Sequence, residues 1–85
     1  MIVKGRVQGV GFRWFVREKA TQFGLTGYVK NLYNGTVEIE AEGERGRVEE
    51  LIRAVKTGPT FSKVADVVIE WRKFTGQYSD FEVTF

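Results

Sequence analysis

The sequence predicts an α+β sandwich in which two amphipathic helices cover one face of a mainly antiparallel sheet. Segments that alternate between apolar and polar residues lie before, between and after two segments with helical periodicity. The dipeptide Asn34-Gly35 is the strongest hairpin signal in the chain and separates two of the strand-like segments. Because 85 residues suit one hydrophobic core, we expect residues 1–85 to form a single domain.

The first strand is expected over residues 2–8, where smaller, more apolar positions alternate with longer polar ones. Gly9 and Gly11 then indicate a tight loop. The first helix is expected to start at residue 12 and to end before Gly24, a residue type that often follows the last helical turn. Its apolar stripe consists of Phe12, Phe15, Val16, Ala20 and Phe23.

The next two strands are expected over residues 25–32 and 36–42, joined by the hairpin at Asn34-Gly35. In the second of them, apolar residues and glutamates alternate strictly. One face of the sheet should therefore be covered and the other exposed to solvent. The apolar positions are Val37, Ile39 and Ala41, and the acidic ones are Glu38, Glu40 and Glu42.

The second helix is expected over residues 44–57, with Gly58-Pro59 ending it. Its apolar stripe consists of Val48, Leu51, Ile52 and Val55. A fourth strand is expected over residues 64–73, and a short last strand should place Phe81, Val83 and Phe85 on one face. The order β-α-β-β-α-β with one extra strand predicts a ferredoxin-like, split β-α-β sandwich.

Composition excludes several kinds of chemistry. The chain contains no Cys and no His, so it has no thiolate or histidine-ligated metal site and no Ser-His-Asp triad. Lys and Arg (13) nearly balance Asp and Glu (11), which gives no sign of a nucleic-acid-binding surface. No apolar run reaches the roughly 18–20 residues of a membrane span, and the N-terminus lacks the pattern of a signal peptide. We therefore expect a cytoplasmic protein with no membrane partner.

The loop after the first strand is the strongest candidate for an anion site. It leads into a helix N-terminus, where backbone N–H groups lack partners and the helix dipole is positive. Gly9 and Gly11 let the backbone curl around an anion, and Arg13 adds a guanidinium that matches phosphate oxygens. Glycine also occurs in such turns for purely steric reasons. Trp14 stands where a dinucleotide-binding fingerprint has its third glycine, and no P-loop Gly-Lys-Ser/Thr follows.

Asn31 is the second candidate. Alternation places its side chain on the same face as Val29, where a carboxamide without partners is costly. One interpretation is local backbone hydrogen bonding next to the hairpin. The other is functional, because a carboxamide accepts and donates hydrogen bonds and can therefore orient a water molecule.

Two segments carry a family resemblance. Residues 5–13 (GRVQGVGFR) and 27–38 (GYVKNLYNGTVE) closely resemble the two signatures of the acylphosphatase family, in the same order and spacing. The similarity extends over essentially the whole chain. One departure is Tyr33-Asn34-Gly35, where many relatives have a Pro-Asp-Gly-like turn, and it concerns hairpin geometry rather than activity.

The resemblance implies an enzyme that hydrolyses the carboxyl–phosphate bond of a small-molecule acyl phosphate to a carboxylate and inorganic phosphate, without metal or cofactor. It implies that Arg13 holds the phosphate and that Asn31 orients the attacking water. We also expect a monomer, with a loop that can accept inorganic phosphate or sulfate. The backbone amides of the phosphate-binding loop would come from Gln8, Gly9, Val10, Gly11 and Phe12.

Three further interpretations stay open. An RNA-binding module can share the topology, but its third strand carries aromatic residues, whereas residues 36–42 carry three glutamates and no aromatic residue. An acylphosphatase-like domain can belong to a larger maturation protein that handles carbamoyl phosphate, with cysteine-rich zinc segments downstream. A relative of the fold can also bind anions without turnover.

Overall fold

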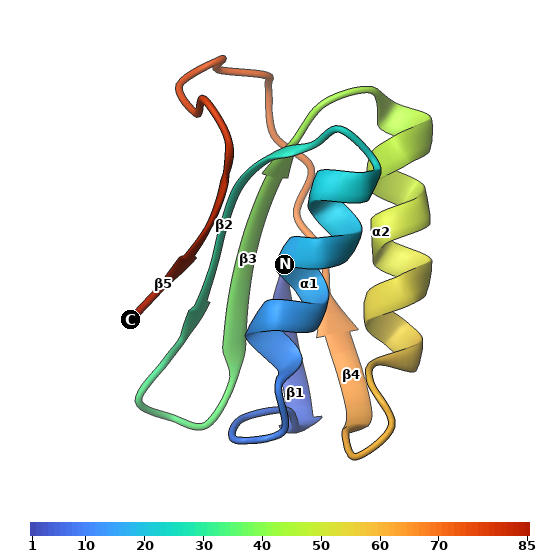
Figure 1. The fold of residues 1–85 in the computed structure, drawn as a ribbon, viewed down its shortest axis with the longest axis vertical. Coiled ribbons are helices and arrows are strands. Elements are labelled where there is room, and N and C mark those ends of the chain that lie inside the picture. The colour runs from blue at the N-terminus through green and yellow to red at the C-terminus, as the bar shows by residue number, and fades with distance from the viewer.

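The computed structural model describes residues 1–85 and contains two helices and five strands (Figure 1). Their order confirms the predicted β-α-β-β-α-β arrangement followed by a short strand. Along the chain they are β1 (Ile2–Arg6), α1 (Phe12–Gln22), β2 (Thr26–Asn31), β3 (Val37–Glu42), α2 (Arg45–Thr57), β4 (Lys63–Val68) and β5 (Phe81–Thr84).

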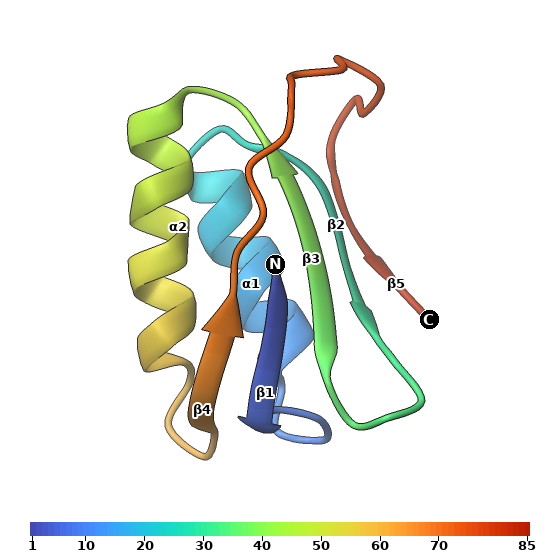
Figure 2. The ribbon, with the colours of Figure 1, turned by 180° about the vertical axis from the view of Figure 1, so that it is seen from behind.

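The strands form one sheet in the order β4-β1-β3-β2-β5. Only the β2–β5 pair is parallel, and the other three pairs are antiparallel. Both helices lie on one face of the sheet, and the opposite face, called the open face below, carries no helix (Figures 1 and 2). The predicted α+β, ferredoxin-like sandwich is confirmed.

The core lies between the helices and the sheet. Of the predicted first stripe, Phe12, Val16 and Ala20 are buried, whereas Phe15 and Phe23 are partly buried against the core. All four predicted residues of α2 are buried. Burying one large aliphatic or aromatic side chain contributes about 1.5–3 kcal/mol, so these contacts hold the two layers together. The strands and the segments next to them contribute Val3, Val7, Leu25, Val29, Val37, Ile39 and Phe81.

The β2–β3 hairpin forms where Asn34-Gly35 predicted it. The Leu32 N–H donates to the Thr36 carbonyl at 2.9 Å, so residues 33–35 make the loop. The Asn34 Oδ1 accepts from the Thr36 N–H at 3.1 Å, a local side-chain bond that is typical of Asn in turns. This hairpin positions the end of β2, where Asn31 lies.

The predicted fourth strand was wrong at its C-terminal end, because β4 stops at Val68 rather than residue 73. β4 pairs with β1, and Ile2 lies opposite Val68. Beyond that pair β1 offers no further strand residue to form the ladder. The last strand also differs from expectation, since Phe81 is buried and Val83 packs against the core but Phe85 lies beyond β5 and is 90% exposed.

No helix combines the length and apolar character needed to cross a bilayer.

Candidate active site

The loop between β1 and α1 depends on two glycines. Gly9 has φ 73°, and Gly11, the N-cap of α1, has φ 75° and ψ 18°. A residue with a Cβ pays roughly 1–2 kcal/mol for such a left-handed conformation. An added Cβ at either position would meet no heavy atom within 4 Å. Backbone conformation, rather than crowding, therefore requires glycine here, and the space in front of the loop is open.

The backbone amides of this loop are free to bind a ligand. No side chain caps α1, and its first turn holds no acidic residue. The first N–H to find a helical partner is that of Phe15, which donates to the Gly11 carbonyl at 3.1 Å, whereas no N–H of residues 8–14 donates a backbone hydrogen bond. The positive end of the helix dipole adds to these donors. The loop is therefore suited to an anion.

Two loop residues carry apolar side chains that pack inward. Phe12 is buried in the core, and Val10 packs against it. Burial of these side chains in the core holds the loop in place, because moving the loop would expose their apolar surface to water. This inward packing is compatible with the prediction that residues 8–12 would bind a phosphate through their backbone amides.

Arg13 is held by the C-terminal end of the chain. Its Nη1 donates to the Thr84 carbonyl at 2.9 Å. Its Cζ lies 4.6 Å from the centroid of the Phe85 ring, a cation–π arrangement. One carbonyl occupies one of the five N–H donors of the guanidinium, so the others stay available to an anion. Sequence reasoning missed Thr84 and Phe85, because they lie about seventy residues from Arg13 and belong to no motif.

Asn31 occupies the last position of β2, opposite Val37 of β3. Its side chain lies on the helix-facing side, as alternation with buried Val29 predicted. The Asn31 Oδ1 is buried and has no hydrogen-bond partner. Leaving a buried acceptor unpaired costs about 1–3 kcal/mol, so such a group in a folded protein calls for an explanation.

Gln8 connects the loop to the strand that carries Asn31. Its Nε2 donates to the Leu32 carbonyl at 2.8 Å and to the Thr36 carbonyl at 2.9 Å. The Gln8 side-chain amide is therefore occupied by the hairpin. The Gln8 backbone N–H donates to no backbone acceptor and stays available to a ligand. The two bonds bring the loop against the hairpin that begins directly after Asn31.

The anchor of Arg13 lies beside the same strand end. Thr84 of β5 pairs with Lys30 of β2, the residue before Asn31. The β1–α1 loop and the β2–β3 hairpin both lie at one end of the molecule (Figure 1). The structure thus brings the predicted residues Gln8, Arg13 and Asn31 to one end of the sheet.

Replacing Gln8 with leucine is expected to weaken inorganic phosphate binding by about tenfold and to lower the free energy of unfolding by about 1–3 kcal/mol, because two hydrogen bonds are lost, although each carbonyl keeps a backbone donor. Phosphate titration and urea unfolding measure the two effects. Gln77→Leu is the control, since no hydrogen bond from its side chain holds the loop, and its phosphate affinity should stay unchanged. Unchanged phosphate affinity in Gln8→Leu would show that the loop holds its shape without this tie.

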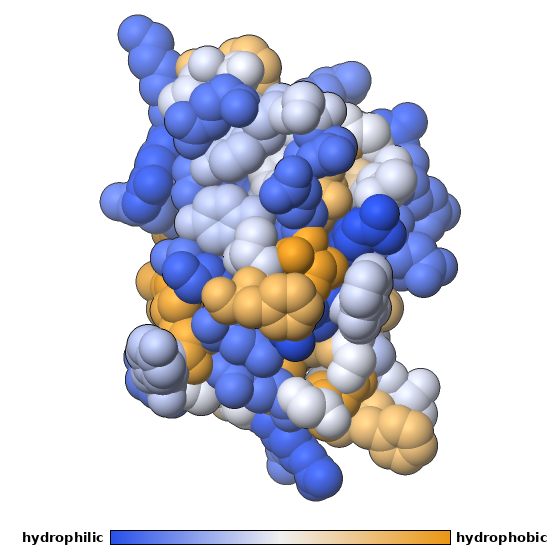
Figure 3. All heavy atoms as spheres, turned by 60° about the vertical axis from the view of Figure 1, so that its left-hand side comes forward, coloured by the Kyte–Doolittle hydropathy of each residue, from blue (hydrophilic) through white to orange (hydrophobic).

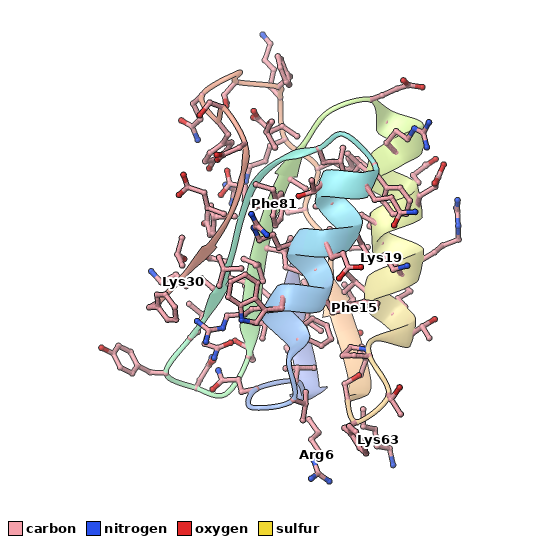
Figure 4. The ribbon with its side chains drawn as sticks, viewed as in Figure 1. Arg6, Phe15, Lys19, Lys30, Lys63 and Phe81 are labelled. Atoms are coloured by element: carbon pink, nitrogen blue, oxygen red, sulfur yellow. The ribbon has the colours of Figure 1, made fainter.

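Two further basic side chains, those of Arg6 and Lys63, lie at the end of the molecule that carries the β1–α1 loop, and that of Arg6 points away from the body of the molecule (Figure 4). On the β5 side, apolar atoms form patches among polar ones (Figure 3). No group of three or more His, Cys, Asp or Glu side chains is arranged to hold a metal ion.

Comparison with known proteins agrees with the site. The acylphosphatase family model matches residues 1–83. An acylphosphatase of Caldanaerobacter subterraneus is 47% identical over 95% of this chain and 90% of its own length. One of Syntrophotalea carbinolica is 51% identical over 98% of this chain and 90% of its own length.

Solved structures show the same relationship. Acylphosphatase from Bacillus subtilis is 43% identical with a TM-score of 0.95, over 99% of this chain and 93% of that one. Full-length HypF in a phosphate- and nucleotide-bound form is 34% identical with a TM-score of 0.84, but the match spans 99% of this chain and only 11% of HypF. The free loop amides, the anchored arginine and these matches lead to one assignment: this chain belongs to the acylphosphatase family, whose members are hydrolases that act on acyl phosphates.

Proposed function

We propose that this chain hydrolyses small acyl phosphates by holding the phosphoryl group between Arg13 and the amides of residues 8–12, while Asn31 orients the attacking water. The observation that supports the water site most directly is the buried, unpartnered Asn31 Oδ1. The observation that supports the phosphate site is the set of N–H groups without backbone acceptors in the loop.

The chemistry matches a site with no histidine and no cysteine. Water attacks phosphorus, an O–P bond forms, and the bond from phosphorus to the acyl oxygen breaks. The carboxylate leaves with the bonding electrons. Its conjugate acid has a pKa of about 4–5, by analogy with the Glu side chain, so it departs without a proton and needs no general acid. The remaining tasks are charge stabilisation and in-line placement of the water.

Arg13 and the loop amides perform the first task. Negative charge on the phosphoryl oxygens is stabilised by donors already in place, which need little reorganisation during the reaction. The contacts of Arg13 with Thr84 and Phe85 hold the guanidinium in position before the substrate binds. Fixing the guanidinium in advance reduces the conformational entropy lost on binding.

Asn31 performs the second task. Its Oδ1 accepts a hydrogen bond from the water and so directs a water lone pair toward phosphorus. We propose that a non-bridging phosphate oxygen receives the water's proton, since no histidine is present and the substrate supplies the nearest base. The water thereby becomes a hydroxyl group of the product phosphate.

Hydrolysis of benzoyl phosphate, with and without a chelator, tests this function against hydrolysis of an aryl phosphate monoester. We expect turnover of the anhydride that the chelator leaves unchanged and little turnover of the monoester. A requirement for added metal, or faster cleavage of the monoester, would contradict the assignment. Phosphate bound without turnover would identify an anion-binding relative.

An RNA-binding role and a role inside a larger maturation protein have less support. On β3 the open face carries Glu38 and Glu40, both hydrogen-bonded to the Tyr28 hydroxyl, and such carboxylates repel nucleic-acid phosphates. We therefore expect no shift of RNA in a gel at physiological salt. The match to HypF is less similar in sequence than the matches to the two bacterial acylphosphatases, which cover nearly their full lengths.

A further inference from the structure

The hairpin after β2 carries the only Asn-Gly step of the chain, and both of its residues, Asn34 and Gly35, are exposed. In such a step the backbone nitrogen of the glycine can attack the side-chain carbonyl carbon of the asparagine. Glycine has no Cβ to hinder that approach. The reaction releases ammonia and turns the asparagine into an aspartate, so the step is a candidate for chemical modification.

The side-chain carbonyl of Asn34 is polarised by two donors. Its Oδ1 accepts from the Thr36 N–H at 3.1 Å and from the Thr36 hydroxyl at 2.6 Å. Both bonds reach forward across residue 35, so they hold the side chain over the peptide bond between Asn34 and Gly35. They also stabilise the negative charge that develops on Oδ1 when a nucleophile adds to Cγ, as the donors of an oxyanion hole do.

The attacking nitrogen and the leaving nitrogen are both weakly held. The Gly35 N–H donates to the Leu32 carbonyl at 3.2 Å, which is the long end of the usual range for such bonds. The hydrogen bonds of the Asn34 side chain all involve Oδ1, so its Nδ2 is free to leave. Every group that reacts is therefore either activated or loosely bound.

Asn31, the other asparagine of the chain, provides an internal comparison. Its Oδ1 has no donor to polarise the carbonyl. The nitrogen that would attack belongs to Leu32, whose N–H donates to the Thr36 carbonyl at 2.9 Å and whose side chain hinders the approach. We therefore expect Asn31 to stay intact under conditions that convert Asn34.

We propose that Asn34 is a site of spontaneous deamidation, promoted by the two donors of Thr36, and that its β-linked product loosens the phosphate loop. Hydroxide takes the Gly35 N–H proton, and the nitrogen forms a bond to the Asn34 Cγ. The bond from Cγ to Nδ2 breaks, and ammonia leaves with a proton returned by water. Water then opens the succinimide ring at Cγ, which gives aspartate, or at the backbone carbonyl, which gives the β-linked isomer.

The β-linked isomer lengthens the hairpin loop. Its backbone runs through the Cβ and Cγ of residue 34 and so contains one more C–C bond, of about 1.5 Å. Loop length fixes the register of a hairpin. The Gln8 Nε2 bridges the two carbonyls at the base of this loop, those of Leu32 and Thr36. Moving one carbonyl relative to the other breaks the bridge and frees the phosphate loop from the hairpin. This consequence rests on the proposed phosphate site, whereas the deamidation does not.

Incubation of the fresh chain at mildly alkaline pH, in water enriched in heavy oxygen, tests the chemistry. Peptide mass mapping should show that Asn34 exchanges its side-chain nitrogen for labelled oxygen while Asn31 stays unchanged. The rate should rise with pH, because hydroxide is the base. An isoaspartyl methyltransferase measures the β-linked fraction. An intact Asn34 in the folded chain, under conditions that convert it in the urea-unfolded chain, would overturn the proposal.

Thr36→Val removes the hydroxyl donor and keeps the N–H, so it should slow deamidation by about threefold or more, the effect of one hydrogen bond. Thr36→Ser is the matched control, because it keeps the hydroxyl and should react at the rate of the original chain. Equal rates in Thr36→Val and the original chain would show that the donors do not promote the reaction, and would contradict the proposal.

Inorganic phosphate binding by the β-linked chain measures the consequence. The reference is Asn34→Asp, which adds the same charge without the longer backbone. We expect the β-linked chain to bind phosphate about tenfold more weakly than this reference, as expected when hydrogen bonds that hold a site are lost. Equal affinities would overturn the loosening of the loop. Failure of the fresh chain to bind phosphate would instead refute the proposed function and would leave the deamidation rates as measured.

Discussion

Replacing Arg13 with lysine is expected to lower kcat/KM for acyl phosphate hydrolysis by about 10²–10³-fold, the usual effect of removing one preorganised donor to a developing negative charge. A lysine ammonium keeps the charge but cannot present two parallel N–H groups to phosphate oxygens. The guanidinium donates to the Thr84 carbonyl while it lies over the Phe85 ring. An ammonium group has no plane and cannot make both contacts in this way. Steady-state kinetics with benzoyl phosphate, and phosphate inhibition, measure the effect.

Arg17→Lys is the matched control. Arg17 lies one turn after Arg13 on the same helix, its guanidinium is 5.7 Å from the centroid of the Trp14 ring, and it makes no hydrogen bond to Thr84. We expect its kcat/KM to stay within about twofold, because a surface charge that does not contact the substrate affects encounter more than chemistry, and lysine keeps that charge. If Arg13→Lys retained the turnover of the original chain while folded, Arg13 would not be the phosphate-binding arginine.

Replacing Asn31 with alanine is expected to lower kcat by at least about 10²-fold and to change phosphate affinity by less than about threefold, as expected for a lost positioning group. The variant should be no less stable than the original chain. Its substitution removes a buried acceptor that has no partner, and such a group costs about 1–3 kcal/mol when folded. Kinetics, phosphate inhibition and urea unfolding test all three statements.

Asn34→Ala is the control for this position. Asn34 lies in the same hairpin, and its Oδ1 accepts hydrogen bonds from the Thr36 N–H and hydroxyl. Its loss should destabilise the hairpin by about 0.5–1.5 kcal/mol, the net value of a typical hydrogen bond, with kcat nearly unchanged. The opposite pattern, with an active Asn31→Ala and an inactive Asn34→Ala, would contradict the assigned roles.

Periodicity alone predicted the helices and most strands, because the apolar stripes are local consequences of which face meets the core. Val48, Leu51, Ile52 and Val55 are spaced so that only one face of a helix can bury them all, and all four are buried. The end of β4 could not be predicted in this way. Residues 69–73 carry a strand-like pattern, but a strand needs a neighbour, and β1 supplies none beyond Ile2.

For the site, the sequence alone determined the chemistry that is available: two loop glycines, one arginine, one asparagine, and no histidine or cysteine. Only the tertiary structure decided that these groups meet at one end of the sheet. Gln8 reaches the carbonyls of Leu32 and Thr36, and Arg13 reaches Thr84. Backbone carbonyls are present at every position and leave no mark in a sequence, so contacts with them become visible only once the strands are in register.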